Sequence, residues 1–177
     1  MNKIQSVLNQ LESIGKQNYM FNIQPNAGKF LNLLIKIKKP KTIIEVGTSN
    51  GYSTIWIASA LKNVKVITVE QDEYKIKLAE ENFKKSGLKN IKIIKGNAVK
   101  VIPKIKEKAD LIFIDATKRE YVKYFKLLEK NMNKGCIILA DNIISHSEKI
   151  DSYLTYVNKK YNSITLSIGS GLELTLT

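Results

Sequence analysis

Short runs of β-branched residues alternate with helical stretches along this chain from residue 42 onward. Five such runs are rich in Ile and Val and have the length of strands that are buried on both faces. They cover residues 42–46, 64–69, 91–95, 111–114 and 136–140. Parallel strands require long crossover connections, which the intervening stretches can supply as helices. The alternation therefore predicts a doubly wound α/β fold with helices on both faces of the sheet.

The spacing of apolar residues predicts where the helices lie. The expected helices cover approximately residues 52–61, 72–86, a short segment after 97, 120–131 and 148–160. Two more helices precede the first strand. The first carries its apolar stripe from Ile4 to Ile14, and the second begins near Pro25. In the second helix, the side chains expected to point inward are Phe30, Leu31, Leu34 and Ile37.

The end of the chain has a different pattern. Two strand-like runs, residues 164–168 and 172–177, are separated by Gly-Ser-Gly, which indicates a hairpin. The sheet should then have seven strands, mostly parallel with an antiparallel C-terminal strand. The 177 residues contain no Pro/Ser-rich linker and no repeat. We expect one domain over residues 1–177, in which helices of residues 1–38 pack on a core of residues 42–177.

Hydropathy and cysteine content limit the class of protein. No apolar run reaches the ~20 residues of a membrane-spanning helix, and the first 17 residues lack the apolar stretch of a signal peptide. We therefore expect a cytoplasmic protein with no membrane partner. Cys136 is the only cysteine, which excludes an intramolecular disulfide or a cysteine-based metal site. Cys136 and Trp56 are both expected in the core.

The chain is strongly basic, with 29 Lys and Arg against 16 Asp and Glu, a formal charge of +13. Such an excess can indicate a partner with many negative charges, such as RNA. Arg119 is however the only arginine, the residue preferred for bidentate phosphate recognition, and the lysines are spread along the chain. Two interpretations stay open: a solvated, lysine-rich surface and an RNA site.

The segment after the first strand predicts a ligand-binding loop, because ligands of doubly wound sheets bind beyond the carboxyl ends of the strands. Gly47 and Gly51 allow a tight turn and a close approach of the backbone. Ser49 and Tyr52 stand where a dinucleotide fingerprint has its second and third glycines, which argues against NAD. Glu70 ends the second strand, where a carboxylate can accept both hydroxyls of a ribose. A purely structural turn is the alternative.

Five motifs follow the strands in order: EVGTSNGYST, TVEQ, KGNA, FIDATKREYVKYF and LADN. From about residue 24 onward the sequence resembles the class I S-adenosylmethionine-dependent methyltransferases, which are Rossmann-like. Within them it resembles the metal-dependent O-methyltransferases, which include catechol and caffeoyl-CoA O-methyltransferases and bacterial relatives acting on hydroxyuridine in tRNA. The resemblance implies S-adenosyl-L-methionine as cofactor. The residues that it assigns to cofactor binding are Glu45, Gly47, Thr48, Ser49, Gly51, Tyr52, Ser53, Glu70 at the ribose, Gln71, Asn97 and Ala98 at the adenine, and Asp115.

Oxygen ligands gather at two neighbouring strand ends. Asp115 ends the fourth strand and Asp141 and Asn142 end the fifth, so their side chains should lie close together. Carboxylate and amide oxygens without His or Cys suit a hard divalent cation such as Mg²⁺. The alternative is that these aspartates cap the turns or helices that follow.

Lys118 stands three residues after Asp115, the D-x-x-K arrangement in which the resembled family has its catalytic lysine. Coordination to a divalent cation lowers the pKa of a hydroxyl, and Lys118 is predicted to take the released proton. Asp115 and Lys118 are the predicted catalytic residues. Without the neighbouring aspartates, Lys118 would be interpreted as a surface lysine.

These observations predict an O-methyltransferase that moves a methyl group to a hydroxyl of a small molecule, and a homodimer is possible. One alternative acceptor is a hydroxyuridine in tRNA, and a second alternative is a cofactor-binding protein without catalysis. Catechol-binding relatives have an acid in the segment before the last hairpin, whereas residues 152–172 contain no Asp or Glu. A catechol substrate is therefore not inferred. His146, the only histidine, is either part of the acceptor pocket or an ordinary surface or capping residue.

Overall fold

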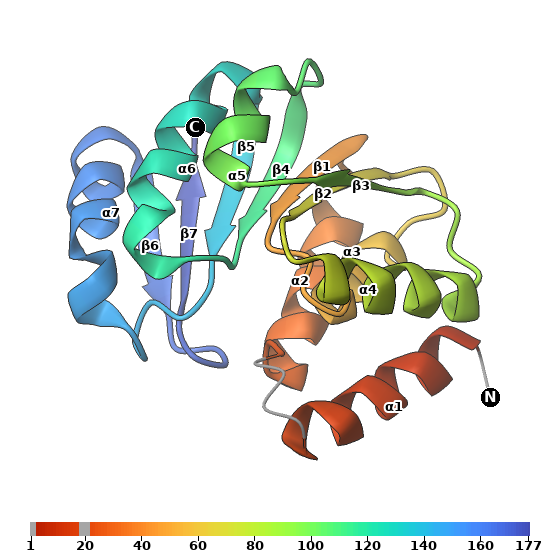
Figure 1. Ribbon diagram of the computed structural model, residues 1–177. Coiled ribbons are helices and arrows are strands. Elements are labelled where there is room, and N and C mark those ends of the chain that lie inside the picture. The colour runs from red at the N-terminus through yellow and green to blue at the C-terminus, as the bar shows by residue number, and fades with distance from the viewer. Residues whose placement is uncertain (1–2, 18–21) are drawn as a thin grey trace.

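A mixed sheet forms the centre of the computed structural model, which describes residues 3–17 and 22–177 (Figure 1). The strands in this part of the chain are β1 (Thr42–Val46), β2 (Lys65–Glu70), β3 (Ile91–Lys95), β4 (Ala109–Ile114), β5 (Met132–Ala140), β6 (Asn162–Leu166) and β7 (Leu172–Leu176). Their order in the sheet is β3-β2-β1-β4-β5-β7-β6. Strands β1 to β5 pair in parallel, whereas β7 is antiparallel to β5 and β6. The predicted fold class is confirmed, including the antiparallel C-terminal strand.

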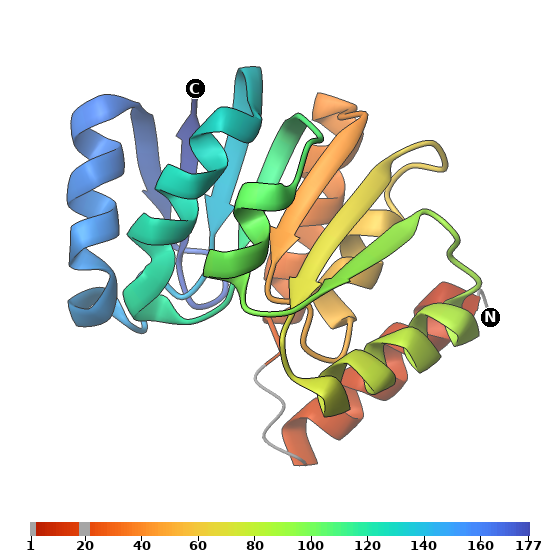
Figure 2. The same cartoon turned by 45° about the horizontal axis from the view of Figure 1, so that its top comes forward.

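Helices cover both faces of this sheet (Figure 2). The α-helices are α1 (Lys3–Gln17), α2 (Pro25–Lys38), α3 (Tyr52–Ala58), α4 (Glu73–Ser86), α5 (Ala98–Val101), α6 (Tyr121–Leu128) and α7 (Ser147–Lys160). Helices α2 to α4 pack on one face, α1 packs against α3 and α4, and α5 to α7 pack on the other face. Short 3₁₀ turns occupy residues 102–104, 118–120 and 129–131. No helix among the described residues is long and apolar enough to span a membrane.

Two apolar cores result from the alternation of side chains along the strands. In β1, Ile43 belongs to the core under α1 to α4, and Ile44 belongs to the core under α5 to α7. Both side chains are fully buried. The prediction that strands are buried on both faces fails for β3, whose residues are partly or fully exposed. The reason is that β3 lies at the edge of the sheet, where it has a neighbouring strand on one side only.

The structure of helix α2 differs from the prediction at Ile37 and accounts for the burial of Trp56. Ile37, expected to point inward, is 79% exposed, because the buried face of α2 includes Leu31 and Ile35 instead. Trp56 and Cys136 are buried, as predicted. The indole of Trp56 lies against Gly28 of α2, where an added Cβ would stand 2.6 Å from the ring. A glycine here therefore allows α2 and α3 to approach each other closely.

Candidate active site

A cleft of about 710 Å³ opens at the carboxyl ends of β1, β2, β4 and β5. Its walls come from the loop after β1, from these strand ends, from residues 22–24 ahead of α2, and from the turn before β7. The predicted cofactor residues that line it are Gly47, Thr48, Ser49, Tyr52, Ser53, Glu70, Gln71, Ala98 and Asp115. Glu45, Gly51 and Asn97 are not among the lining residues. The cleft thus brings together most of the residues that the sequence motifs indicated.

The two glycines of the loop after β1 have positive φ angles, +107° at Gly47 and +87° at Gly51. The backbone N–H groups of Gly47 and Thr48 donate to the carbonyl oxygen of Val69, at 3.1 and 3.2 Å. A Cβ at residue 47 would lie 2.1 Å from the carbonyl oxygen of Asp115. Gly47 is therefore required for the loop to rest on the ends of both β2 and β4.

The carboxylate of Glu70 organises the loop at the β2 end of the cleft. Its Oε2 accepts from the backbone N–H of Ser49 at 2.9 Å, and its Oε1 accepts from Gln71 and Asp72 at 2.8 and 3.0 Å. A carboxylate has about four acceptor positions, so capacity for a ligand hydroxyl is left. The side-chain amide of Asn97 donates to Gln71 Oε1 at 3.1 Å, so Asn97, which does not line the cleft, is joined to Gln71, which does.

Glu45 lies beneath the loop and not in the cleft. Its side chain is fully buried and accepts hydrogen bonds from Ser53, Thr54 and Thr68, at 2.6, 2.5 and 2.6 Å. Burial raises the pKa of the Glu45 carboxyl to about 7, against the opposing effect of these hydrogen bonds. Glu45 does not make the expected contact with a cofactor. Its carboxylate instead holds the first turn of α3, because β1 is a central strand and directs this side chain inward.

Asp115 and Lys118 form an ion pair at the β4 end of the cleft, with Nζ 2.6 Å from Oδ1. Both side chains line the cleft and are largely buried, 15% and 17% exposed. The 3₁₀ turn at residues 118–120 brings the lysine back over the strand end. Lys118 Nζ also lies 5.3 Å from the ring centre of Tyr121, within the range of a cation–π contact.

Asp141 adjoins this pair, because Ala140 of β5 pairs with Ile114 of β4. Its side chain is buried, and its Oδ1 has no hydrogen-bond partner. Burial, and after it the negative charge of Asp115, raise the pKa of the Asp141 carboxyl well above its ordinary range. Asn142 follows with a positive φ of 65° and lines the cleft.

These oxygens have the chemistry of a site for a hard cation. Two adjacent carboxylates repel each other, and an unpartnered buried oxygen is unfavourable unless a cation or a proton compensates it. Within the described residues, no group of three or more His, Cys, Asp or Glu side chains is placed to hold a metal ion. A cation here would thus rely on the carboxylates of Asp115 and Asp141, the amide oxygen of Asn142, and ligands from outside the chain.

Comparison with known proteins identifies the family. The family model described as O-methyltransferase matches residues 2–165. The chain belongs to the O-methyltransferase family. Catechol O-methyltransferase of Niastella koreensis is 39% identical over 140 residues, which cover 76% of this chain and 63% of that protein. Catechol O-methyltransferase of Mycobacterium tuberculosis is 31% identical over 125 residues, covering 69% of this chain and 57% of that protein. The chain thus spans less than two thirds of the length of these relatives.

A solved structure agrees with this assignment to the O-methyltransferase family. The O-methyltransferase from Bacillus cereus, solved in complex with SAH, superimposes with a TM-score of 0.86 at 26% identity. The superposition covers 97% of this chain and 90% of the other.

Several residues of the cleft were not predicted from the sequence. Asn22, Gln24 and Ser170 lie outside the motifs of the O-methyltransferase resemblance, and no local pattern marks them as site residues. Ser145 and His146 line the cleft beside Asn142. For His146, the structure therefore favours the pocket over an ordinary surface position. Its side chain makes no capping hydrogen bond to α7.

Proposed function

We propose that this protein transfers the methyl group of S-adenosylmethionine to a hydroxyl oxygen of a small acceptor, assisted by a divalent cation. The observation that carries the proposal is that a glycine loop with a strand-end carboxylate, Glu70, shares one cleft with the Asp115–Lys118 pair. Family membership and the relatives named as catechol O-methyltransferases support it.

The residues of the β2 side fit the adenosine end of the cofactor. Glu70 keeps acceptor capacity for a ribose hydroxyl, and Gln71 and Ala98 line the same part of the cleft. Gly47 and Thr48 lead from there to Asp115. We propose that the methionine end follows this course, so that the methyl group faces the end of β4.

Asp115, Asp141 and Asn142 are the residues that would hold the cation, and the unpartnered Oδ1 of Asp141 supports this assignment. Oxygen ligands of this kind favour Mg²⁺ over softer metals. When bound, the cofactor supplies an electrophilic methyl group, and the cation lowers the pKa of a hydroxyl that it coordinates.

Lys118 is the proposed general base: its ammonium group would first lose a proton to solvent, and the neutral Nζ would then accept the proton of the acceptor hydroxyl. Its ion pair with Asp115 holds Nζ at the strand end where the hydroxyl would lie. The cleft walls orient the acceptor, and good orientation can supply ~7–11 kcal/mol of a barrier. Residues 22–24 also line the cleft and would add to its walls around the acceptor.

The test is a transfer assay with radiolabelled S-adenosylmethionine, a panel of phenols and catechols, and unmodified tRNA, each with Mg²⁺ or with excess chelator. We expect Mg²⁺-dependent labelling of a small hydroxylated acceptor. Labelling of tRNA alone would assign the acceptor to nucleic acid. Calorimetry should show tighter binding of S-adenosylmethionine than of NAD, and the reverse order would contradict the proposal.

A further inference from the structure

The sheet order separates the two ends of the cleft. Glu70 ends β2 and Asn142 follows β5, three strands along in the order β2-β1-β4-β5. Neighbouring strands are ~4.8 Å apart, so these positions are roughly 14 Å apart along the edge. Ser145, His146 and Ser170 line the cleft on the β5 and β7 side. If the cofactor occupies the Glu70 side, as the proposed function requires, this second wall faces the acceptor.

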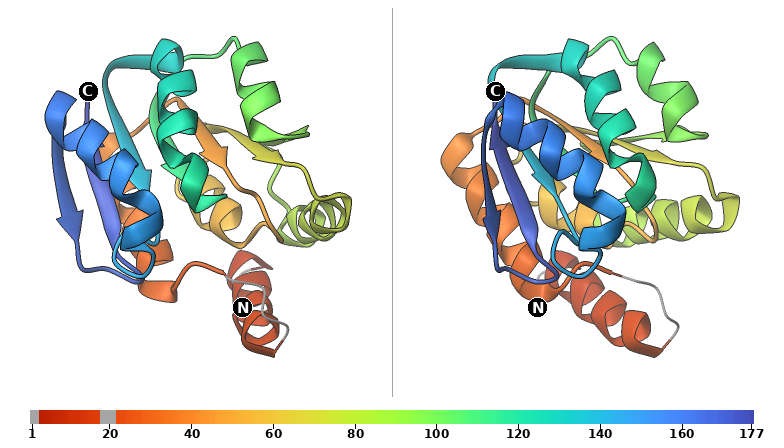
Figure 3. Two further views of the ribbon diagram at one scale, coloured as in Figure 1. Left: turned by 60° about the vertical axis from the view of Figure 1, so that its left-hand side comes forward. Right: turned by 90° about the vertical axis from the view of Figure 1, so that its left-hand side faces the viewer.

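This acceptor wall, formed by residues 142–146 and 169–171, is fixed by backbone hydrogen bonds. The N–H groups of Ile144 and Ser145 both donate to the carbonyl oxygen of Ser170, each at 3.1 Å. The turn between β6 and β7 lies beside the segment that enters α7 (Figure 3). Gly171 has a φ of +91°, and a Cβ there would lie 2.6 Å from the N atom of Ile144. The backbone of the wall is thus held in place by contacts within the chain itself.

His146 lines the cleft, and one nitrogen of its ring is in contact with the chain itself. Its Nδ1 is 3.0 Å from Ser145 Oγ, and the same oxygen receives the amide of Asn142 at 3.4 Å. The Ser145 hydroxyl has two acceptors for its proton, His146 Nδ1 at 3.0 Å and the carbonyl oxygen of Asn142 at 3.4 Å, and Nδ1 is the nearer. When Nδ1 accepts from Ser145, the ring proton is on Nε2, and Nε2–H is the donor left for a ligand.

The other side chains of the wall are uncharged. Asn142, Ser145 and Ser170 offer an amide and hydroxyls, Asn22 and Gln24 line the same cleft, and residues 152–172 contain no carboxylate that could pair with a cationic substrate. We infer that His146 is a specificity-determining residue, which binds a carboxylate carried by the small hydroxylated acceptor through Nε2–H. Acceptors bearing an ammonium group instead find no partner on this wall.

The experiment measures binding, so that it does not depend on turnover. Calorimetry with S-adenosylhomocysteine and Mg²⁺ present compares 3,4-dihydroxybenzoate with dopamine, in the wild type and in His146→Leu. We expect the carboxylate to bind about tenfold more tightly than the amine in the wild type, the scale of a hydrogen bond to a charged group. In His146→Leu this preference should be lost, while the affinity for S-adenosylhomocysteine stays unchanged.

Two controls separate a direct contact from the general positive charge of the chain. Lys159→Met removes a charge from the far end of α7, and should keep the preference for the carboxylate. The preference should also persist in 0.5 M salt, where the field of distant charges is screened, since the Debye length falls to about 4 Å. Loss of the preference in Lys159→Met or in high salt would overturn the inference.

Equal binding of the two acceptors by the wild type, or an unchanged preference in His146→Leu, would also overturn it. The transfer assay on the same acceptors tests the proposed function separately. A His146-dependent preference without methyl transfer would support this binding site and refute the catalytic proposal. Transfer to dopamine and dihydroxybenzoate with equal kcat/KM would support the catalytic proposal and refute the role of His146.

Discussion

The two carboxylates at the ends of β4 and β5 differ in whether a neighbouring group compensates their charge. Asp115 is paired with Lys118, whereas the neighbouring Asp141 is buried with one oxygen unpartnered. A folded protein compensates such an oxygen with a proton or a cation. The arrangement is unfavourable for stability alone, and it is the kind of strain that proteins keep where it serves a function.

Lys118→Met tests the role of the lysine as general base. We expect kcat to fall roughly 10²–10⁴-fold, the usual contribution of a positioned proton acceptor, with little change in KM. Steady-state kinetics with saturating acceptor measure both. Lys123→Met is the matched control, because Lys123 is an exposed lysine of α6. A wild-type kcat in Lys118→Met would exclude the lysine as the base.

Asp141→Ala distinguishes the proposed role in cation binding from a role in cofactor binding. The variant should lose methyl transfer, because one of two carboxylates for the cation is removed, while its affinity for S-adenosylmethionine stays within about tenfold, or ~1.4 kcal/mol. Calorimetry and the transfer assay measure the two effects. Full activity of the wild type in excess chelator would show that Asp141 has a structural role only.

The raised pKa of the Glu45 carboxyl predicts that the stability of the fold depends on pH. This pKa is about 7 in the folded chain and near the ordinary 4.5 when unfolded. Below pH 4.5 the carboxyl is protonated in both states. As the pH rises to about 7, Glu45 ionises in the unfolded chain before it ionises in the folded chain. The free energy of unfolding therefore falls, by on the order of 3 kcal/mol. Urea unfolding from pH 4.5 to 8 should show this loss in the wild type relative to Glu45→Gln. Parallel stability curves for the two proteins would contradict the shifted pKa.

At the scale of elements, the contact between α2 and α3 depends on a missing side chain. An alanine is normally favoured over glycine in a helix by ~0.5–1 kcal/mol. At residue 28, however, the new Cβ would overlap the Trp56 ring. Gly28→Ala should therefore destabilise the fold, by about 1–3 kcal/mol for overpacking. Urea unfolding measures the change, with the exposed Lys36→Ala in the same helix as control. A more stable Gly28→Ala would show that α2 shifts freely.

The local pattern predicted most elements to within a few residues, since burial of one face leaves a period in the sequence. Strands β1 and β3 were placed with their observed bounds, at residues 42–46 and 91–95. The pattern did not show that Ile35 and not Ile37 is buried in α2, because the two residues have the same hydropathy. Nor did it show that β3 is an edge strand, because strand order is set by long-range pairing.

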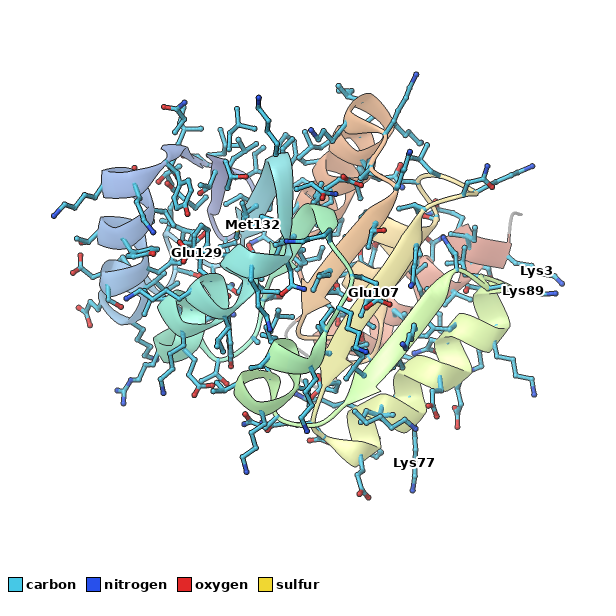
Figure 4. The ribbon with its side chains drawn as sticks, turned by 90° about the horizontal axis from the view of Figure 1, so that it is seen from above. Lys3, Lys77, Lys89, Glu107, Glu129 and Met132 are labelled. Atoms are coloured by element: carbon cyan, nitrogen blue, oxygen red, sulfur yellow. The ribbon has the colours of Figure 1, made fainter. Side chains whose placement is uncertain are left out.

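At the scale of the whole molecule, the positive charge is spread over the surface. Lys3, Lys77 and Lys89 are exposed, and they extend outward from the periphery of the molecule, as Figure 4 shows. Dispersed lysines give a general attraction to polyanions without a defined site. This distribution favours the interpretation of a solvated, lysine-rich surface.

The distribution predicts how salt affects activity. For a neutral catechol, kcat/KM should change less than about twofold between about 0.05 and 0.5 M salt, because an uncharged acceptor is not attracted by the field of the dispersed lysines. Retention of tRNA on a filter, measured in parallel, should fall steeply over the same range, since each phosphate contact adds to the salt slope. Salt-resistant tRNA binding would instead indicate a specific RNA site.

The sequence by itself determined the order of the elements, the loop after β1, and the strand-end positions of Glu70, Asp115, Asp141 and Asn142. Periodicity and turn chemistry are local, and parallel topology then gathers strand ends at one edge. Only the tertiary structure decided that Glu45 lies beneath the loop, that Asp141 keeps an unpartnered oxygen, and that residues 22–24 and Ser170 join the cleft. These properties depend on burial depth and on contacts between segments far apart in the chain, which leave no period in the sequence.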